Sequence, residues 1–179
     1  MEVRASHWHH SPIHLFIPDA TYMVTAGTLE KAHYSRDARL RHLCDQLHEV
    51  ARTHGWHLHA WAVFSNHYHW IGHTESDPKS LIRLISHVHT VTAKWVNQQD
   101  RCPGRKVWFQ YWDKCLTYEN SYYARLNYVN QNPVNHGIVP VAELYPYGSA
   151  QWFATKADPT YRRKVASYKF DQLRIEDDF

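Results

Sequence analysis

Two histidines separated by a single residue, His67 and His69, have a spacing that suits a metal site. They fall in the aromatic run from Phe64 to Trp70, which predicts a β-strand. Successive side chains of a strand alternate between faces, so the two imidazoles point to one side, about 7 Å apart along the backbone. Both are therefore within reach of one metal ion, for which they supply half of a site.

A second pair with the same spacing, His57 and His59, stands in the preceding predicted strand. If residues 65–66 form a two-residue hairpin loop, Ala62 lies opposite His69, and directly paired residues share a face. His57 and His59 then lie on the reverse face. Under that register the two pairs cannot bind the same ion.

The surroundings favour His67 and His69 as the metal pair. Their face includes the small residues Ala60 and Ala62, which leave it open, whereas the other pair shares its face with bulky aromatic rings. Either pair can instead be a set of structural histidines that hydrogen-bond within the fold.

The other half of the candidate chemistry lies on a predicted helix that begins at Glu119 or Asn120. Pro133 ends this helix at Asn132, because the residue before a proline avoids the helical region. Tyr128 and Asn132 are four residues apart, so the phenol and the amide stack on one helical face. A nucleophile is one interpretation of Tyr128. Core packing is the other, since the chain has twelve tyrosines and a single tyrosine is most often a packing residue.

Further elements follow from apolar spacing and turn residues. The order is strand, helix, hairpin, helix, strand, helix. The predicted elements before the helix of Tyr128 are a strand over 21–28, a helix from 35 or 37 to 53, strands over 56–64 and 67–73, a helix from 77 or 78 to 97, and a strand over 107–117.

Basic residues stand beside the aromatic strand 107–117. Arg105 and Lys106 end a basic turn that leads into it. A surface for single-stranded nucleic acid needs this combination, because cations neutralise phosphates and rings stack on bases for roughly 1 to 3 kcal/mol each. Core packing explains the same rings equally well.

Length and composition limit the class of protein and its partners. A chain of 179 residues with 44% hydrophobic residues can bury one core, and a net charge of +3 permits nucleic acid without requiring it. Three widely spaced cysteines without a CxxC pair argue against a disulfide framework or a structural zinc site. No apolar run approaches 18 residues and no signal-peptide core is present, so we expect a cytoplasmic protein.

Two motifs, Asn66-His67-Tyr68-His69 and Tyr128-x-x-x-Asn132-Pro133-Val134, occur in an order and separation that give the chain a family resemblance. The chain resembles the bacterial REP-associated tyrosine transposases, a branch of the single-tyrosine HUH transposases, where HUH means His-hydrophobic-His. The matching segments are residues 22–25, 60–69, 112–113, 128–139 and 145–149.

The resemblance implies an α+β, ferredoxin-like fold, an antiparallel sheet with two helices on one face. It divides the chain into an N-terminal arm over 1–20, a transposase domain over 21–150 and a variable C-terminal tail over 151–179. It makes Tyr128 the nucleophile of a metal-dependent transposase that forms a 5′-phosphotyrosine intermediate. The metal, Mg²⁺ or Mn²⁺, is bound by His67, His69 and an amide oxygen of Asn132.

The implied partner is single-stranded DNA with hairpin, REP-like elements, bound by a monomer or homodimer. Arg105, Lys106 and Arg125 are the expected phosphate contacts. Two other functions are compatible with the same residues. One is a catalytically inactive module that binds nucleic acid, and the other is a metal-dependent nuclease that uses water.

Overall fold

The computed structural model describes residues 15–175 of the chain. Four antiparallel strands form one sheet in the order β2-β3-β1-β4. The strands are β1 (Thr21–Thr28), β2 (His57–Val63), β3 (His67–His73) and β4 (Trp108–Leu116).

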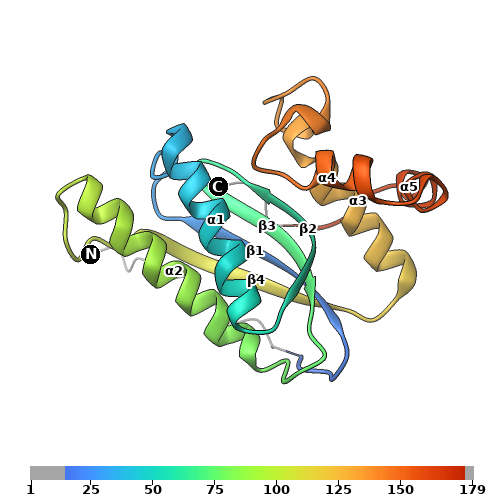
Figure 1. Cartoon of the computed structure of the whole chain (residues 1–179), viewed down its shortest axis with the longest axis horizontal. Helices are drawn as coiled ribbons and strands as arrows, with labels where there is room; N and C mark the ends of the chain where they lie inside the picture. The colour runs from blue at the N-terminus through green and yellow to red at the C-terminus, as the bar shows by residue number, and fades with distance from the viewer. Residues whose placement is uncertain (1–14, 176–179) are drawn as a thin grey trace, which may run out of the picture.

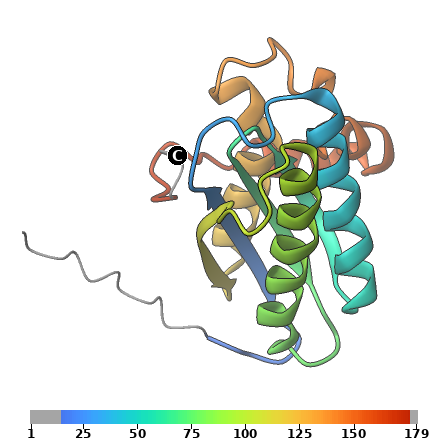
Figure 2. The same ribbon diagram turned by 90° about the vertical axis from the view of Figure 1, so that its left-hand side faces the viewer.

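Helices cover both faces of this sheet. α1 (Asp37–Thr53) and α2 (Ser80–Gln99) pack side by side on one face, and α3 (Glu119–Asn135) lies on the other, mainly against β2 (Figures 1 and 2). The sheet with α1 and α2 is the predicted ferredoxin-like, α+β arrangement, which is therefore confirmed. α3 forms a further helical layer on the opposite face of the sheet, and it carries Tyr128.

The two faces of the sheet differ in chemistry. On β3, Tyr68 and Trp70 are fully buried, and the Tyr68 hydroxyl lies 2.9 Å from Nε2 of His89 on α2. The alternating residues His67 and His69 point to the face covered by α3. Apolar packing thus gathers under α1 and α2, while polar side chains face α3.

The predicted elements of the core are confirmed to within a few residues. α2 begins at Ser80, two residues after Pro78, because a turn precedes it in which Asp77 Oδ1 accepts a hydrogen bond of 2.9 Å from the Lys79 N–H. Helix ends often differ by this much between sequence and structure.

The predicted end of α3 is wrong. The helix continues through Pro133 to Asn135. A proline in the last turn removes only one helical hydrogen bond, so the chain can continue past it. Gly137, with φ +66°, ends the helix, and its N–H and that of Ile138 donate to the carbonyls of Val134 (2.8 Å) and Pro133 (3.0 Å). This pair of bonds is a Schellman motif.

The predicted face of His57 and His59 is also wrong, because His57 pairs directly with His73, which shares a face with His67 and His69. Ala62 pairs with His69 as expected, but the register shifts between Leu58 and Ala60. This β-bulge adds one residue to β2 and turns His59 towards α3, where its Nδ1 lies 3.1 Å from the hydroxyl of Tyr122. The histidine ring also stacks on His73, with ring centroids 6.1 Å apart.

The C-terminal region is folded as far as the structure describes it. It contains a 3₁₀ turn η1 (Ala142–Leu144) and two short helices, α4 (Ala150–Lys156) and α5 (Pro159–Ala166). α5 packs on α3, and Lys164 forms an ion pair of 2.5 Å with Glu119 at the start of α3. The sequence did not predict these helices.

Most of the expected N-terminal arm lies outside the described residues. Between residues 15 and 175, no helix is both long and apolar enough to span a lipid bilayer.

Candidate active site

Tyr128 lies beside the histidine pair of β3. The ring centroids of His69 and Tyr128 are 5.4 Å apart, and those of His67 and His69 are 5.1 Å apart. Asn132 is one helical turn after Tyr128, and all four side chains are at least nine-tenths buried. The structure therefore brings together the residues that the sequence suggested as nucleophile and as metal ligands.

A clamp between the sheet edge and the C-terminal region holds α3 in this position. Ser149 is fully buried, and its hydroxyl donates to Asn130 Oδ1 on α3 (2.6 Å). The same hydroxyl accepts from the backbone N–H of Trp61 on β2 (3.0 Å), and the Ser149 N–H donates to the Trp61 carbonyl (2.8 Å). α3 is thus tied to the edge strand two residues from Tyr128.

Both histidines are oriented through Nδ1. Asn66 Oδ1 lies 3.0 Å from Nδ1 of His67, and Thr25 Oγ1 lies 2.7 Å from Nδ1 of His69. An Nδ1–H that donates to such an oxygen leaves the lone pair on Nε2, which is how metal-binding histidines are usually held. The motif and the matching segments of the sequence included Asn66 and Thr25 but gave neither residue a role, although Thr25 is directly paired with His69 across β1 and β3.

The donor set suits a divalent ion bound by nitrogen and oxygen. Two imidazoles and the amide of Asn132 match the mixed ligation that Mn²⁺ accepts, whereas Mg²⁺ prefers oxygen. Within residues 15–175, no group of three or more His, Cys, Asp or Glu side chains is arranged to hold a metal ion. A metal here therefore relies on Asn132 or another neutral ligand beside the two histidines.

A third imidazole stands at the edge of the site. His136 follows the last residue of α3 and is exposed. Its ring centroid lies 5.1 Å from that of His67 and 5.1 Å from that of Phe64, whose ring stacks on His67 at 4.5 Å. The only sequence signal for His136 was its position shortly after Pro133.

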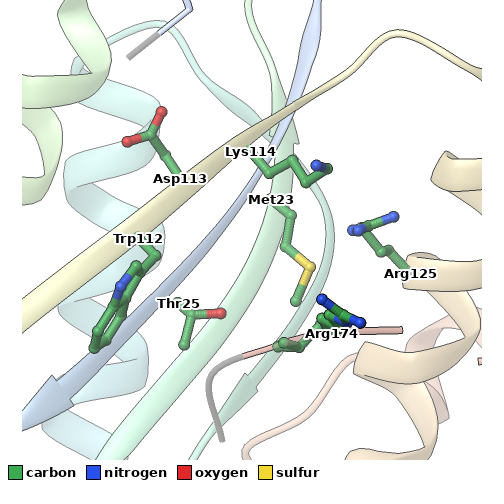
Figure 3. Close-up of a pocket in the computed structure, with 8 residues that line it drawn as sticks. Met23, Thr25, Trp112, Asp113, Lys114, Arg125 and Arg174 are labelled. Atoms are coloured by element: carbon green, nitrogen blue, oxygen red, sulfur yellow. The ribbon is translucent and has the colours of Figure 1, made fainter. Parts of the chain in front are cut away.

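A cavity of about 200 Å³ opens beside the site on the same face of the sheet. Arg125, three residues before Tyr128 on α3, lines it and is 7% exposed (Figure 3). Its Nη1 donates to Ser121 Oγ at 2.6 Å, and burial lowers the pKa of its guanidinium from the ordinary value. Of the three predicted phosphate contacts, only Arg125 lies on the helix of Tyr128.

Arg105 and Lys106 lie elsewhere. Arg105 belongs to an ion-pair network in which it contacts Asp100 at 2.6 Å, and Arg39 pairs with the same carboxylate. Hydrogen bonds from the two guanidinium groups lower the pKa of Asp100 to about 2. Lys106 lines a groove beside α2. The structure does not bring either residue together with Tyr128.

The neighbouring aromatic strand is partly core. Trp108 is buried, stacked on His89 at 4.2 Å, whereas Phe109 is exposed. Core packing therefore explains Trp108, one of the rings that the sequence offered as a possible base-stacking surface.

No family model matches the sequence, and neither does any curated protein. Among solved structures, the chain is similar to a REP-associated tyrosine transposase bound to a REP hairpin, with 18% identity over 95% of this chain and 94% of that one and a TM-score of 0.67. It is also similar to the crystal structure of a candidate transposase from Deinococcus radiodurans R1, with 16% identity over 71% of this chain and 97% of that one and a TM-score of 0.45. The first similarity extends over nearly the whole length of both chains. This protein therefore has the fold of a REP-associated tyrosine transposase.

Proposed function

We propose that the protein is a transposase that cleaves and rejoins single-stranded DNA, with Tyr128 as its nucleophile. One observation carries the proposal: the Tyr128 ring lies 5.4 Å from the ring of His69, on facing elements of a transposase fold. A phenol in this place can reach a phosphate that also touches the imidazoles.

Each step of the proposed reaction forms one phosphoester bond and breaks another, so it needs no outside energy source. The phenol, with an ordinary pKa near 10, loses its proton before or during attack. Its oxygen forms a bond to phosphorus while the bond to the 3′ oxygen of the preceding nucleotide breaks, which gives a 5′-phosphotyrosine and a free 3′-hydroxyl. Attack by another 3′-hydroxyl reverses these steps, rejoins the strand and restores Tyr128.

The residues that would hold a divalent ion, Mg²⁺ or Mn²⁺, are His67, His69 and Asn132. When bound, such an ion would neutralise charge on the scissile phosphate. Asn66 and Thr25 orient the two imidazoles, and α3 carries both Tyr128 and Asn132, so one rigid helix sets the distance between nucleophile and ligand.

The substrate that we propose is single-stranded DNA beside a hairpin, bound by a monomer or a homodimer. The similar solved transposase holds a REP hairpin, which supports this class of substrate. The net charge of +3 is compatible with it.

The test is incubation of the protein with labelled hairpin DNA that carries a single-stranded flank, in Mn²⁺, followed by denaturing electrophoresis. We expect a covalent protein–DNA band that disappears in Tyr128→Phe and in His67→Ala. Tyr118→Phe is the matched control, because Tyr118 is 77% exposed at the start of α3 and should leave the band unchanged.

Other outcomes point to other functions. Cleavage without a covalent band, unaffected by Tyr128→Phe, would indicate a nuclease that uses water. Binding without cleavage under all metal conditions would indicate an inactive nucleic-acid-binding module.

A further inference from the structure

The cavity beside Tyr128 is lined by side chains from three elements and the C-terminal segment. The floor is the sheet, where Thr25 pairs with Trp112 and Met23 pairs with Lys114. α3 forms one wall, and residues 174–175 form another. The residues that line the cavity are Met23, Thr25, Trp112, Asp113, Lys114, Arg125, Arg174 and Ile175.

Three cations converge on this cavity. Figure 3 shows Lys114, Arg125 and Arg174 directed towards one another from β4, α3 and the C-terminal segment. The carboxylate of Asp113 points away from them, as expected for the next residue along a strand. No carboxylate within residues 15–175 forms an ion pair with any of the three.

Of the three cations, Arg125 is the costly one, because a buried charge is normally paired and burial lowers the pKa of its guanidinium. The hydrogen bonds of Arg125 go to the hydroxyl (2.6 Å) and the carbonyl (3.4 Å) of Ser121, both neutral acceptors. The site is therefore built to receive an anion, and a guanidinium fork suits the oxygens of a phosphate.

The position of the cavity identifies the source of the anion. Arg125 precedes Tyr128 by nearly one helical turn, about 5 Å along the axis. Thr25 lines the cavity with the same side chain that contacts Nδ1 of His69. An anion in the cavity would thus lie next to the place where the scissile phosphate meets Tyr128.

We propose that this cavity binds a backbone phosphate of single-stranded DNA that neighbours the scissile phosphate. The inference rests on the proposed function and adds a second phosphate site to it. Holding two successive phosphates fixes the strand's position along α3, so the phenol meets one particular phosphodiester.

The experiment measures DNA binding by fluorescence anisotropy in the Tyr128→Phe background, which prevents cleavage. Lys114→Met and Arg174→Met remove exposed cations and leave Arg125 in place. We expect each to weaken binding about tenfold at low salt and to lower the slope of log affinity against log salt by about 0.7, the value for one contact on a single strand. Lys79→Met is the matched control, an exposed lysine at the start of α2 on the other face of the sheet.

A second measurement identifies the contacted phosphate. A series of oligonucleotides carries one neutral methylphosphonate at each successive position around the cleavage site. One position should weaken binding by the Lys114-containing protein and have no further effect in Lys114→Met. If no position shows this dependence, or if Lys114→Met and Lys79→Met have equal effects, the cavity is not a phosphate site.

These results separate the two proposals. A covalent band that forms normally, together with unchanged binding in Lys114→Met and Arg174→Met, would overturn the second phosphate site and leave the tyrosine chemistry intact. Phosphate-dependent binding without any covalent band would overturn the tyrosine chemistry instead.

Discussion

Thr25 Oγ1 lies 2.7 Å from Nδ1 of His69, and the two residues are directly opposite each other on β1 and β3. The contact joins the first strand of the fold to the candidate metal site. It also places the Thr25 side chain between the site and the cationic cavity.

Thr25→Val should therefore weaken metal binding without preventing folding, because valine is close to threonine in shape but cannot hold the imidazole of His69. Loss of such a contact typically lowers metal affinity 10- to 100-fold. Calorimetric titration with Mn²⁺ measures the change directly. Thr155→Val on α4, whose hydroxyl bonds only within its own helix, is the control and should bind Mn²⁺ normally.

Ser149→Ala should loosen the clamp between β2 and α3. The buried hydroxyl serves both Asn130 and the backbone of Trp61, so its removal leaves buried polar groups unsatisfied, at a cost of about 1 to 3 kcal/mol. Urea denaturation gives the change in free energy of unfolding. Ser167→Ala, at an exposed site after α5, should change that free energy by less than about 0.5 kcal/mol. Equal effects of the two substitutions would contradict the clamp.

His89 should make the protein sensitive to acid. Burial lowers its pKa from 6.5 to about 3, whereas the unfolded chain protonates it near its ordinary value. The unfolded state therefore binds more protons between these pH values, and stability is lost as the pH falls from about 6.5 towards 3. One such group changes the free energy of unfolding by about 1.4 kcal/mol per pH unit.

The variant His89→Phe keeps a ring against Trp108 and removes the titrating group. Its unfolding free energy, measured in urea from pH 7 to pH 4, should depend less steeply on pH than that of the unchanged protein. Parallel pH profiles would show that His89 does not carry this acid sensitivity.

Local patterns predicted the core of the fold because each depends on neighbours in sequence. Strand alternation placed His67 and His69 on one face, and helical spacing placed Tyr128 and Asn132 together. The Ser65-Asn66 turn gave the correct pairing of Ala62 with His69.

The remaining features depend on contacts between distant residues. Thr25 meets His69 only because β1 pairs with β3, and the cationic cavity needs β4, α3 and the C-terminal segment together. The course of α3 past Pro133 is set by the Schellman motif at Gly137, which the rule for residues before proline does not foresee.

The bulge at His59 determines how the side chains of β2 respond to a change in the length of this strand. One extra residue in an edge strand shifts the phase of every side chain before it, while Ala60, Ala62 and the hairpin keep theirs. Deletion of a single codon there would rephase the beginning of β2 and swing His57 to the opposite layer. The paired imidazoles of β3 would keep their orientation, so a change of length in the edge strand would leave the candidate metal site in place.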